Sequence, residues 1–359
     1  STADILRFLQ LEANYSSPLL PFLGGGFAYD YLATFEELPE VKPGANTYPD
    51  YEFLVAQTVL AVDHLQGTAH LEGWGIDEER LRKELDYLAS LPAAARPAVP
   101  QKEKIRAVAD VDDAGFRAGV DKLKGNIHAG DIYQVVPARA FTVDCPNALA
   151  AYRALRETNP SPYMFYVRGA AYELFGASPE SNLKFTPEDR QIQLYPIAGT
   201  RPRGLNPDGS INHELDIRNE LDMRTDQKEI AEHTMLVDLA RNDLARVAVP
   251  RSRQVAELLH VDRYSRVMHL VSRVTATLHP DFDALDAYRA CMNMGTLTGA
   301  PKLRATELVR RTEGKRRGSY GGAVGYLRGD GAMDNCIVIR SAYVQDGTAV
   351  VQAGAGVVK

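Results

Sequence analysis

The sequence predicts an α+β fold with extensive antiparallel sheet, and three features of the 359-residue chain lead to this prediction. First, segments with helical spacing alternate with short strand-like runs along most of the chain. Second, Arg266 to Leu278 is rich in β-branched residues, which favour strands. Third, two apolar runs flank Asp346-Gly347, a dipeptide typical of a two-residue hairpin, and a hairpin joins antiparallel strands.

The bulk composition is that of a soluble globular protein, with 45% hydrophobic and 25% charged residues. The formal net charge of −6 gives no electrostatic footprint for nucleic acid. No apolar run approaches the ~18 residues of a membrane span. Cys145, Cys291 and Cys336 are widely spaced and form no CxxC pair. This pattern favours reduced, packed thiols in the cytoplasm over a disulfide framework or a zinc site.

Residues 1–103 are expected to form an N-terminal part of the chain. They contain the glycine run Gly24-Gly25-Gly26, a strand over Phe53 to Val62 and a helix that begins at Asp77, a typical N-cap. The segment from Pro92 to Glu103 is rich in proline and alanine and lacks periodicity, so it is expected to be a linker.

Residues 104–359 form a second expected part, in which helix and strand patterns interleave. Helices are expected over residues 112–128, 148–158, 225–247 and 301–313, and strands over residues 132–141, 163–167, 192–197 and 266–278. The last of these helices has proline at its first turn and Gly314 just past its end, as helices often do.

Glu229 and Glu232 lie three residues apart on a predicted helix, so they share one helix face. One interpretation is local: Asp226 caps the helix, Glu229 completes a capping box, and the helix dipole favours both acids. The other interpretation is that the two carboxylates hold a hard dication such as Mg²⁺, which prefers oxygen ligands. The spacing alone leaves both open.

Glu180 and His269 each allow a structural and a chemical interpretation. Glu180 follows a predicted strand in FGASPES, where it is either a solvated loop acid or a general acid that burial keeps protonated. His269 lies among apolar residues in VMHLVSRV, where it is either a satisfied core residue or a polar group that points into a pocket.

The stretch from Leu194 to Gly204, LYPIAGTRPRG, leaves a predicted strand for a glycine-bearing loop. It lacks the GKS or GKT of a P-loop and the GxGxxG of a dinucleotide site. Arg201 and Arg203 are candidates for binding an anion, as is Arg340 in the strand-like IVIRSA.

Taken together, ten ordered segments resemble the family of chorismate-utilising enzymes, and within it the large components of anthranilate synthases. The segments are GDIYQVVPAR (130–139), NPSPYMFY (159–166), FGASPES (175–181), PIAGTRPRG (196–204), DQKEIAEHTMLVDLARNDLARV (226–247), VDRYSRVMHLVSRV (261–274), MGTLTGAPK (294–302), RRGSYGGAVGY (316–326), CIVIRSA (336–342) and QAGAGVV (352–358). GGGFAYDY (24–31) is also similar to the family's first half.

This resemblance implies a four-layer α/β/β/α sandwich of two packed, largely antiparallel sheets, dependence on Mg²⁺, and chorismate as substrate. It implies that Glu229 and Glu232 hold the metal and that Glu180 protonates the departing C4 hydroxyl. His269 matches the histidine associated with loss of pyruvate, and Thr200 matches a further position of the catalytic site. The substrate-binding residues that it implies are Gln134, Ala198, Gly199, Thr296, Tyr320, Arg340, Gly354 and Gly356.

Two of these positions bear on the nucleophile. Isochorismate- and salicylate-forming members of the family place a lysine at the position of Gln134 to activate water, and glutamine cannot act as a base. Aminodeoxychorismate-forming members often carry a lysine in place of Ala198. A site without either lysine suits ammonia, which implies conversion of chorismate and ammonia to anthranilate and pyruvate, the first committed step of tryptophan biosynthesis. Formation of aminodeoxychorismate is the alternative.

The resemblance also implies a partner and an inhibitor. Ammonia in this family comes from a glutamine amidotransferase subunit. Nothing in the sequence resembles the GxCxG turn and Cys-His-Glu triad of such a subunit, so a separate chain is expected. Pro162, Tyr163, Met164 and Cys336 match positions that line an allosteric L-tryptophan pocket, which implies feedback inhibition.

Two features of the family do not occur in the sequence. The strand of LLES type that contributes to the tryptophan pocket is expected before Ser1, and a C-terminal helix with further metal-site acids is expected after Lys359. Two acids alone make a poor Mg²⁺ site, because the ion tolerates little geometric error. A catalytically inactive fragment that only binds a ligand or partner is therefore a further alternative.

Overall fold

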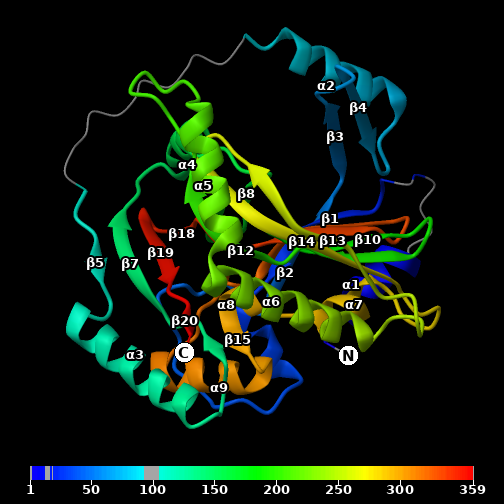
Figure 1. Ribbon diagram of the computed structural model, residues 1–359. Helices are drawn as coiled ribbons and strands as arrows, with labels where there is room; N and C mark the ends of the chain where they lie inside the picture. Colours follow the sequence, from blue (N-terminus) through cyan, green and yellow to red (C-terminus); the bar gives the residue numbers. More distant parts are fainter. Residues whose placement is uncertain (1, 13–16, 18, 93–104, 359) are drawn as a thin grey trace.

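The computed structural model describes residues 2–12, 17, 19–92 and 105–358 (Figure 1). Residues 93–103 of the predicted linker lie outside this part of the chain. Within the described ranges, the strands form sheets of nine, six, three and two strands, and neighbouring strands are antiparallel. No helix in these ranges combines the length and the apolar character needed to cross a membrane.

The nine-stranded sheet has the order β12-β14-β11-β10-β17-β16-β1-β2, and β13 also pairs with β14. Its strands are β1 (Phe22–Phe27), β2 (Tyr51–Ala56), β10 (Ser181–Thr186), β11 (Gln191–Leu194), β12 (Ile197–Pro202), β13 (Gln254–Arg263), β14 (Val267–Thr277), β16 (Ala323–Arg328) and β17 (Met333–Ile337). Because β1 pairs with both β2 and β16, the N-terminal part shares this sheet with the C-terminal part. The division of the chain between residues 103 and 104 stays a prediction.

The six-stranded sheet has the order β5-β7-β19-β18-β9-β8. Its strands are β5 (Val108–Ala109), β7 (Ala138–Asp144), β8 (Tyr163–Arg168), β9 (Glu173–Ser178), β18 (Ser341–Gln345) and β19 (Thr348–Gly354). The smaller sheets contain β15 (Gly299–Ala300), β6 (Gln134–Val135) and β20 (Val357–Val358), and β3 (Thr58–Asp63) and β4 (Thr68–Gly73).

The helices of the described residues include all those that the sequence predicts. They are α1 (Asp4–Arg7), a π-helical segment (Phe8–Glu12), a 3-10 helix (Tyr29–Thr34), α2 (Glu78–Ser90), α3 (Asp113–His128), α4 (Ala148–Thr158), α5 (His213–Thr225), α6 (Gln227–Ala245), α7 (Ala284–Cys291), α8 (Gly295–Thr298) and α9 (Lys302–Glu313). Asp77 caps α2 as predicted, and Gly314 ends α9 in the left-handed region. Asp226 caps α6 by accepting from the amides of Lys228 and Glu229.

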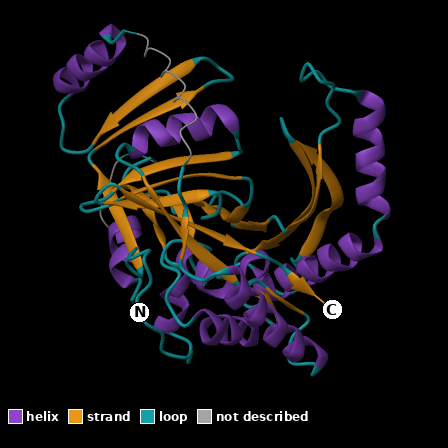
Figure 2. Ribbon diagram, turned by 90° about the vertical axis from the view of Figure 1, so that its left-hand side faces the viewer, coloured by secondary structure: helices purple, strands orange, loops and turns teal. Residues whose placement is uncertain are grey.

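Alternation of side chains along the strands shows how the layers stack. In β17, Cys336 belongs to the core between the two large sheets, and Ile337 belongs to the core under α6 and α7. In β9, Leu174 belongs to the core between the sheets, and Phe175 packs with residues of α4. The order of layers confirms the predicted α/β/β/α sandwich, in which strands lie inside and helices outside (Figure 2).

The predicted hairpin at Asp346-Gly347 is confirmed. It joins β18 to β19, with Gln345 opposite Thr348, and both turn residues have positive φ, as a type I′ turn requires. The apolar run before it is not one strand, however. It passes from β17 in one large sheet to β18 in the other, and Arg340 lies at the crossing with φ of +48°.

Three strands predicted as continuous are interrupted in the structure. Pro137 separates β6 from β7, and Pro196 separates β11 from β12, because proline has no N–H to donate to a ladder. The strand predicted over residues 53–62 ends at Ala56, and the chain then leaves the nine-stranded sheet to form the β3–β4 hairpin. The breaks after β2 and at Pro137 move the chain to new pairing partners, whereas β11 and β12 both pair with β14 across the break at Pro196.

The cysteines behave as the sequence predicts. Cys145, Cys291 and Cys336 are all within the described residues, and each is buried and free. Burial raises the pKa of the Cys291 thiol above its usual value, so this group is a packing residue and not a ready nucleophile.

Candidate functional site

Glu180 occupies the turn from β9 into β10, with 5% of its surface exposed. The interpretation as a solvated loop acid is therefore wrong. Burial raises the pKa of its carboxyl group to about 8, although the Thr296 hydroxyl and the backbone of Ile197 favour the charged form. The carboxyl group is thus mostly protonated near neutral pH, which is the state that a general acid requires.

His269 lies on β14, where its Cα pairs with that of Thr200 on β12. His269 Nδ1 is 2.9 Å from Thr200 Oγ1, and the histidine is 3% exposed. Burial and the positive charge of Arg340 lower the pKa of His269, so the imidazole is neutral near neutral pH. If Nδ1 carries the proton and donates it to Thr200 Oγ1, Nε2 has a free lone pair.

Several buried polar atoms lack a partner, and such atoms are uncommon in native proteins. Within the described ranges there are seven of these side-chain atoms: Gln134 Oε1, Glu180 Oε1, Ser181 Oγ, His233 Nδ1, His269 Nε2, Thr275 Oγ1 and Thr296 Oγ1. Four of the seven belong to predicted site residues, namely Gln134, Glu180, His269 and Thr296. Thr296 is close enough to affect the pKa of Glu180, yet neither oxygen has a partner in normal hydrogen-bond geometry. A polar ligand can satisfy these atoms.

A β-bulge in β12 shapes the segment LYPIAGTRPRG. The register against β14 shifts between Ala198 and Thr200, and Gly199 is the extra residue, with φ of +80°. A Cβ atom at Gly199 would lie 3.4 Å from Glu229 Oε2. The bulge thus brings the backbone of β12 against a carboxylate of α6.

The arginines of this segment bind carboxylates of the chain itself. Arg201 forms ion pairs with Asp222 at 2.6 Å, Asp226 at 3.0 Å and Glu229 at 3.1 Å, and Arg203 pairs with Asp216 at 2.8 Å. The interpretation of Arg201 and Arg203 as sites for an external anion is therefore corrected. The Glu229 side chain turns to Arg201, and the amide of Asp226 donates to Asp222 O, so the predicted capping box does not form.

Glu232 lies next to Glu229 on the same face of α6. Burial, and then the charge of Glu229, raise the pKa of Glu232, and a Cβ atom at Gly356 would lie 3.7 Å from Glu232 Oε1. A dication between the two acids would relieve their repulsion, which fits Mg²⁺. No group of three or more His, Cys, Asp or Glu residues suited to a metal occurs in the described part of the chain. Within the described residues, Glu229 and Glu232 can thus supply two ligands to a metal ion.

Arg340 carries a guanidinium group without an ion pair or a hydrogen bond to any of the described residues. Burial lowers its pKa, while the nearby Tyr264 and Glu180 favour its charge. An unpaired guanidinium beside an unpartnered carboxyl group suits a planar carboxylate of a ligand. The sequence interpretation missed Tyr264, whose ring centre is 5.5 Å from that of His269.

Tyr320 and Gly354 meet at the end of β19. A Cβ atom at Gly354 would lie 3.1 Å from the Tyr320 hydroxyl, so any side chain there would crowd that oxygen. Gln134, which is 2% exposed, pairs on β6 with Ala300 on one side and Val358 on the other. The ends of neighbouring strands therefore hold predicted site residues that lie far apart in the sequence.

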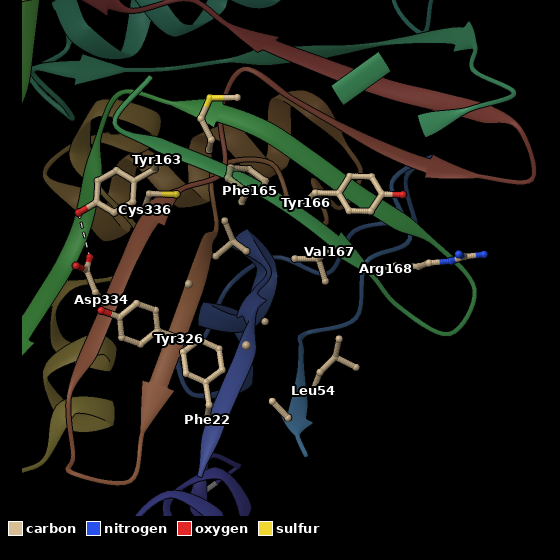
Figure 3. Close-up of a pocket in the computed structure, with 16 residues that line it drawn as sticks. Phe22, Leu54, Tyr163, Phe165, Tyr166, Val167, Arg168, Tyr326, Asp334 and Cys336 are labelled. Carbon is tan, nitrogen blue, oxygen red and sulfur yellow. Dashed lines mark hydrogen bonds between the residues drawn. The ribbon is translucent and has the colours of Figure 1, made fainter. Parts of the chain in front are cut away.

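A separate pocket of about 460 Å³ lies between the two large sheets. Strand β8 forms one wall, and β1, β2, β16 and β17 form the other (Figure 3). Tyr163, Met164 and Cys336 line this pocket, and their allosteric role stays a prediction. Pro162 is exposed and does not belong to the lining.

The same pocket contains an acid that the sequence interpretation missed. Tyr163 donates a hydrogen bond of 3.0 Å to Asp334 Oδ1, and burial raises the pKa of Asp334 (Figure 3). The rings of Phe22 and Tyr326 stack nearby, with centres 5.3 Å apart. Asp334 precedes Cys336 by two residues, so strand alternation could have placed it on the same face. One carboxylate in an aromatic pocket suits a ligand with an apolar ring and a cationic group.

Comparison with known proteins gives consistent matches. The family described as chorismate binding enzyme matches residues 2–359. Anthranilate synthase component 1 of Salmonella typhimurium is 54% identical over 368 residues, which cover 100% of this chain and 70% of that protein. Anthranilate synthase component 1 of Escherichia coli is 53% identical over 367 residues, with 100% and 70% covered.

Solved structures agree with these sequence matches. Anthranilate synthase component I from Streptococcus pneumoniae superposes with a TM-score of 0.88 at 31% identity, covering 100% of this chain and 81% of that one. The menaquinone-specific isochorismate synthase from Escherichia coli has a TM-score of 0.76 at 20% identity, over 100% of this chain and 77% of that one. The second match shows a shared fold.

Proposed function

Because the chain belongs to the family of chorismate binding enzymes, we propose that it converts chorismate and ammonia to anthranilate and pyruvate, the first committed step of tryptophan biosynthesis. The buried carboxyl group of Glu180, whose Oε1 has no hydrogen-bond partner, is the observation that carries this proposal. A carboxyl group that keeps its proton near neutral pH is suited to protonating the C4 hydroxyl, so that this group leaves as water while ammonia adds at C2.

His269 then acts in the loss of pyruvate. Its neutral imidazole has an unpartnered Nε2, and Thr200 orients the ring through Nδ1. Such a nitrogen can accept the proton that leaves the ring as the bond to the enolpyruvyl oxygen breaks and the ring becomes aromatic. Enolpyruvate departs and becomes pyruvate.

The nucleophile is ammonia itself. Gln134 offers an amide and no base for the activation of water, and Ala198 offers a methyl group and no amine. Both positions belong to the candidate site. Gln134 Oε1 is one of its unpartnered buried atoms, and Ala198 is the residue at which the β12 bulge begins. Gln134 favours the proposal over formation of isochorismate, and Ala198 favours it over formation of aminodeoxychorismate.

Several residues would bind substrate and metal. Arg340, with its unpaired guanidinium, suits the enolpyruvyl carboxylate, and Tyr320 and Gly354, which meet at the end of β19, would bind the same group. Glu229 and Glu232 would hold Mg²⁺, which neutralises the ring carboxylate of chorismate when bound. Gly199, Thr296 and Gly356 complete the substrate-facing surface.

The proposal includes a partner, an inhibitor and a location. A glutamine amidotransferase subunit, as a separate chain, supplies the ammonia, and the reaction takes place in the cytoplasm. L-Tryptophan binds between the sheets, with its indole against Phe22 and Tyr326 and its ammonium group at Asp334, and inhibits the reaction.

The direct test is fluorescence detection of anthranilate after incubation of the chain with chorismate, Mg²⁺ and ammonium. We expect anthranilate and pyruvate in equal amounts, and no anthranilate from a Glu180→Gln variant. Aminodeoxychorismate or isochorismate as the main product contradicts the proposed reaction. Binding of chorismate without any turnover supports the inactive-fragment alternative instead.

A further inference from the structure

Arg317 is the largest of the fully buried side chains in the described ranges, with 2% exposure. Its guanidinium group is surrounded by partners on every side. Nε and Nη2 bind the carboxylate of Glu313 at 2.9 and 2.6 Å, and the ring of Tyr29 lies 4.4 Å from Cζ. An isolated buried charge would be very costly, so this full set of partners explains how the arginine is tolerated.

The remaining donors of Arg317 reach two backbone carbonyls. Nη1 donates to Leu297 O at 2.8 Å, and Nη2 donates to Val136 O at 2.6 Å. Leu297 directly follows Thr296, and Val136 lies two residues after Gln134. Arg317 therefore holds the two segments that carry the unpartnered oxygens of Thr296 and Gln134.

Glu313 also binds the segment that follows Val136 and, through it, reaches the end of β19. Its Oε1 also accepts a 2.8 Å hydrogen bond from the amide of Ala138, whose Cα pairs with that of Gly354 at the end of β19. Tyr320 follows Arg317 by three residues, and its ring centre is 5.8 Å from the guanidinium carbon. One buried ion pair thus contacts the segments of Gln134, Thr296 and Tyr320 directly and is linked to Gly354 through Ala138.

We propose that Arg317, held by Glu313, is a positioning residue that sets the spacing of Gln134, Thr296, Tyr320 and Gly354 around the substrate. This inference rests on the proposed function. Arg317 itself does not face the substrate, because its side chain is buried and four of its five N–H groups bind the protein. Only a guanidinium can bind one carboxylate with two nitrogens, reach two carbonyls and stack on a ring at the same time.

A purely stabilising role is the competing explanation, and a second buried arginine allows the two to be separated. Arg310 is 7% exposed and pairs with the buried Asp30 at 2.7 Å, and its Nε donates to Pro39 O at 2.9 Å. Asp30 and Pro39 are not candidate site residues. Arg310 contacts none of the groups that Arg317 and Glu313 bind, so Arg310→Lys alters a comparable buried arginine in a neighbouring ion pair, whose Asp30 also accepts from the amide of Gly318.

The experiment compares Arg317→Lys, Glu313→Gln and Arg310→Lys with the unaltered chain. The measurements are kcat and KM for chorismate in anthranilate formation, the Mg²⁺ concentration for half activity, the Kd of chorismate with Mg²⁺ in the absence of ammonia, and Tm. Arg317→Lys keeps the positive charge but loses the two-nitrogen contact with the carboxylate. Glu313→Gln keeps an acceptor for the Ala138 amide but weakens the interaction with Arg317.

We expect Arg317→Lys to lower kcat/KM for chorismate by about 100-fold and to raise the Kd by about tenfold, since small misplacements of binding groups have effects of this size. Glu313→Gln should shift both in the same direction by a smaller factor. The Mg²⁺ requirement should stay unchanged in both, because Glu229 and Glu232 lie on α6, outside the contacts of Arg317. Arg310→Lys should lower Tm and leave KM and Kd as they are.

The inference is overturned if both site variants keep normal KM and Kd, if all three variants change them equally, or if only Arg310→Lys folds. Failure of the proposed function is a different result, because the unaltered chain would then form no anthranilate at all.

Discussion

The carboxyl group of Glu180 has lost nearly all contact with solvent, and its acid–base behaviour follows from that burial. Its pKa is about 8, against a usual value of 4.5, so the native protein keeps a proton that the unfolded chain releases. Between these two values the unfolded state binds fewer protons, and stability falls as the pH rises.

The first prediction therefore concerns stability. From the pKa difference, the free energy of unfolding should drop by on the order of 4 kcal/mol between about pH 5 and about pH 8, and the loss should end above the native pKa. Glu180→Gln should remove this slope, because an amide does not titrate. Urea unfolding across that pH range measures the effect, with the exposed Glu188→Gln as the control. A slope that survives Glu180→Gln would show that another group causes it.

For single residues, the sequence predicted which side chains belong to the candidate site better than it predicted their burial and their partners. The motif around Glu180 pointed to an acid, but its burial depends on strands that lie far away in the chain, such as β17, whose Ile337 amide donates to Glu180 O. Arg201 and Arg203 were candidates for binding an external anion. Their ion-pair partners on α5 and α6 could not be identified without the fold. Strand alternation could have placed Asp334 on the face of Cys336, but the pocket itself forms between two sheets and has no local pattern in the sequence.

Among the elements, β12 has the most direct effect on the site, because its bulge gives the chain a bend that regular pairing would not allow. Gly199 has φ of +80°, close to the +86° of Gly209 in the loop that precedes α5. A Cβ atom at Gly209 would meet nothing within 4 Å, whereas one at Gly199 would approach both Glu229 Oε2 and Leu270. Both glycines have a backbone conformation that would strain an L-residue, but their surroundings differ.

The second prediction uses this pair. Gly199→Ala and Gly209→Ala should each lower the free energy of unfolding by about 1 kcal/mol, since an L-residue is strained at such φ. Only Gly199→Ala should also raise the Mg²⁺ concentration for half activity, by about tenfold, because the methyl group crowds a proposed metal ligand. Magnesium titrations of activity with both variants distinguish the cases. Equal magnesium requirements would remove Glu229 from the proposed metal site.

Helices were predicted more accurately than strands, for a physical reason. The helical patterns over residues 112–128 and 148–158 match α3 and α4 because helix hydrogen bonds are local. The boundaries of β6, β7, β11 and β12 depend on which distant strand lies alongside, and the prolines at 137 and 196 show only that a break is needed.

In the molecule as a whole, the pocket lies between the two large sheets and is lined by strands that are far apart in the sequence. Its walls belong to different sheets, with β8 in one and β1, β2, β16 and β17 in the other. A ligand bound there contacts both sheets at once, so it stabilises their native packing by mass action.

The third prediction follows from this placement. L-Tryptophan should raise Tm and inhibit anthranilate formation, and Asp334→Asn should raise the inhibitory concentration by about tenfold through loss of a charge-assisted hydrogen bond. Asp346→Asn, in the exposed β18–β19 turn, is the matched control and should leave inhibition unchanged. Thermal melts and inhibition curves give the two readouts. Normal inhibition of Asp334→Asn would mean that the ammonium group binds elsewhere.

The pairing of β1 with β16 also has a consequence for how the protein is made. Phe22 lies opposite Arg328 and Phe27 opposite Ala323, so β1 leaves the ribosome long before the strand with which it pairs. Contacts of such long sequence separation slow folding, and an unpaired strand edge is open to association with other chains. The glycine-rich β1 has little side-chain surface to bury early. Synthesis of this chain therefore includes a period in which chaperones can bind the unfinished sheet.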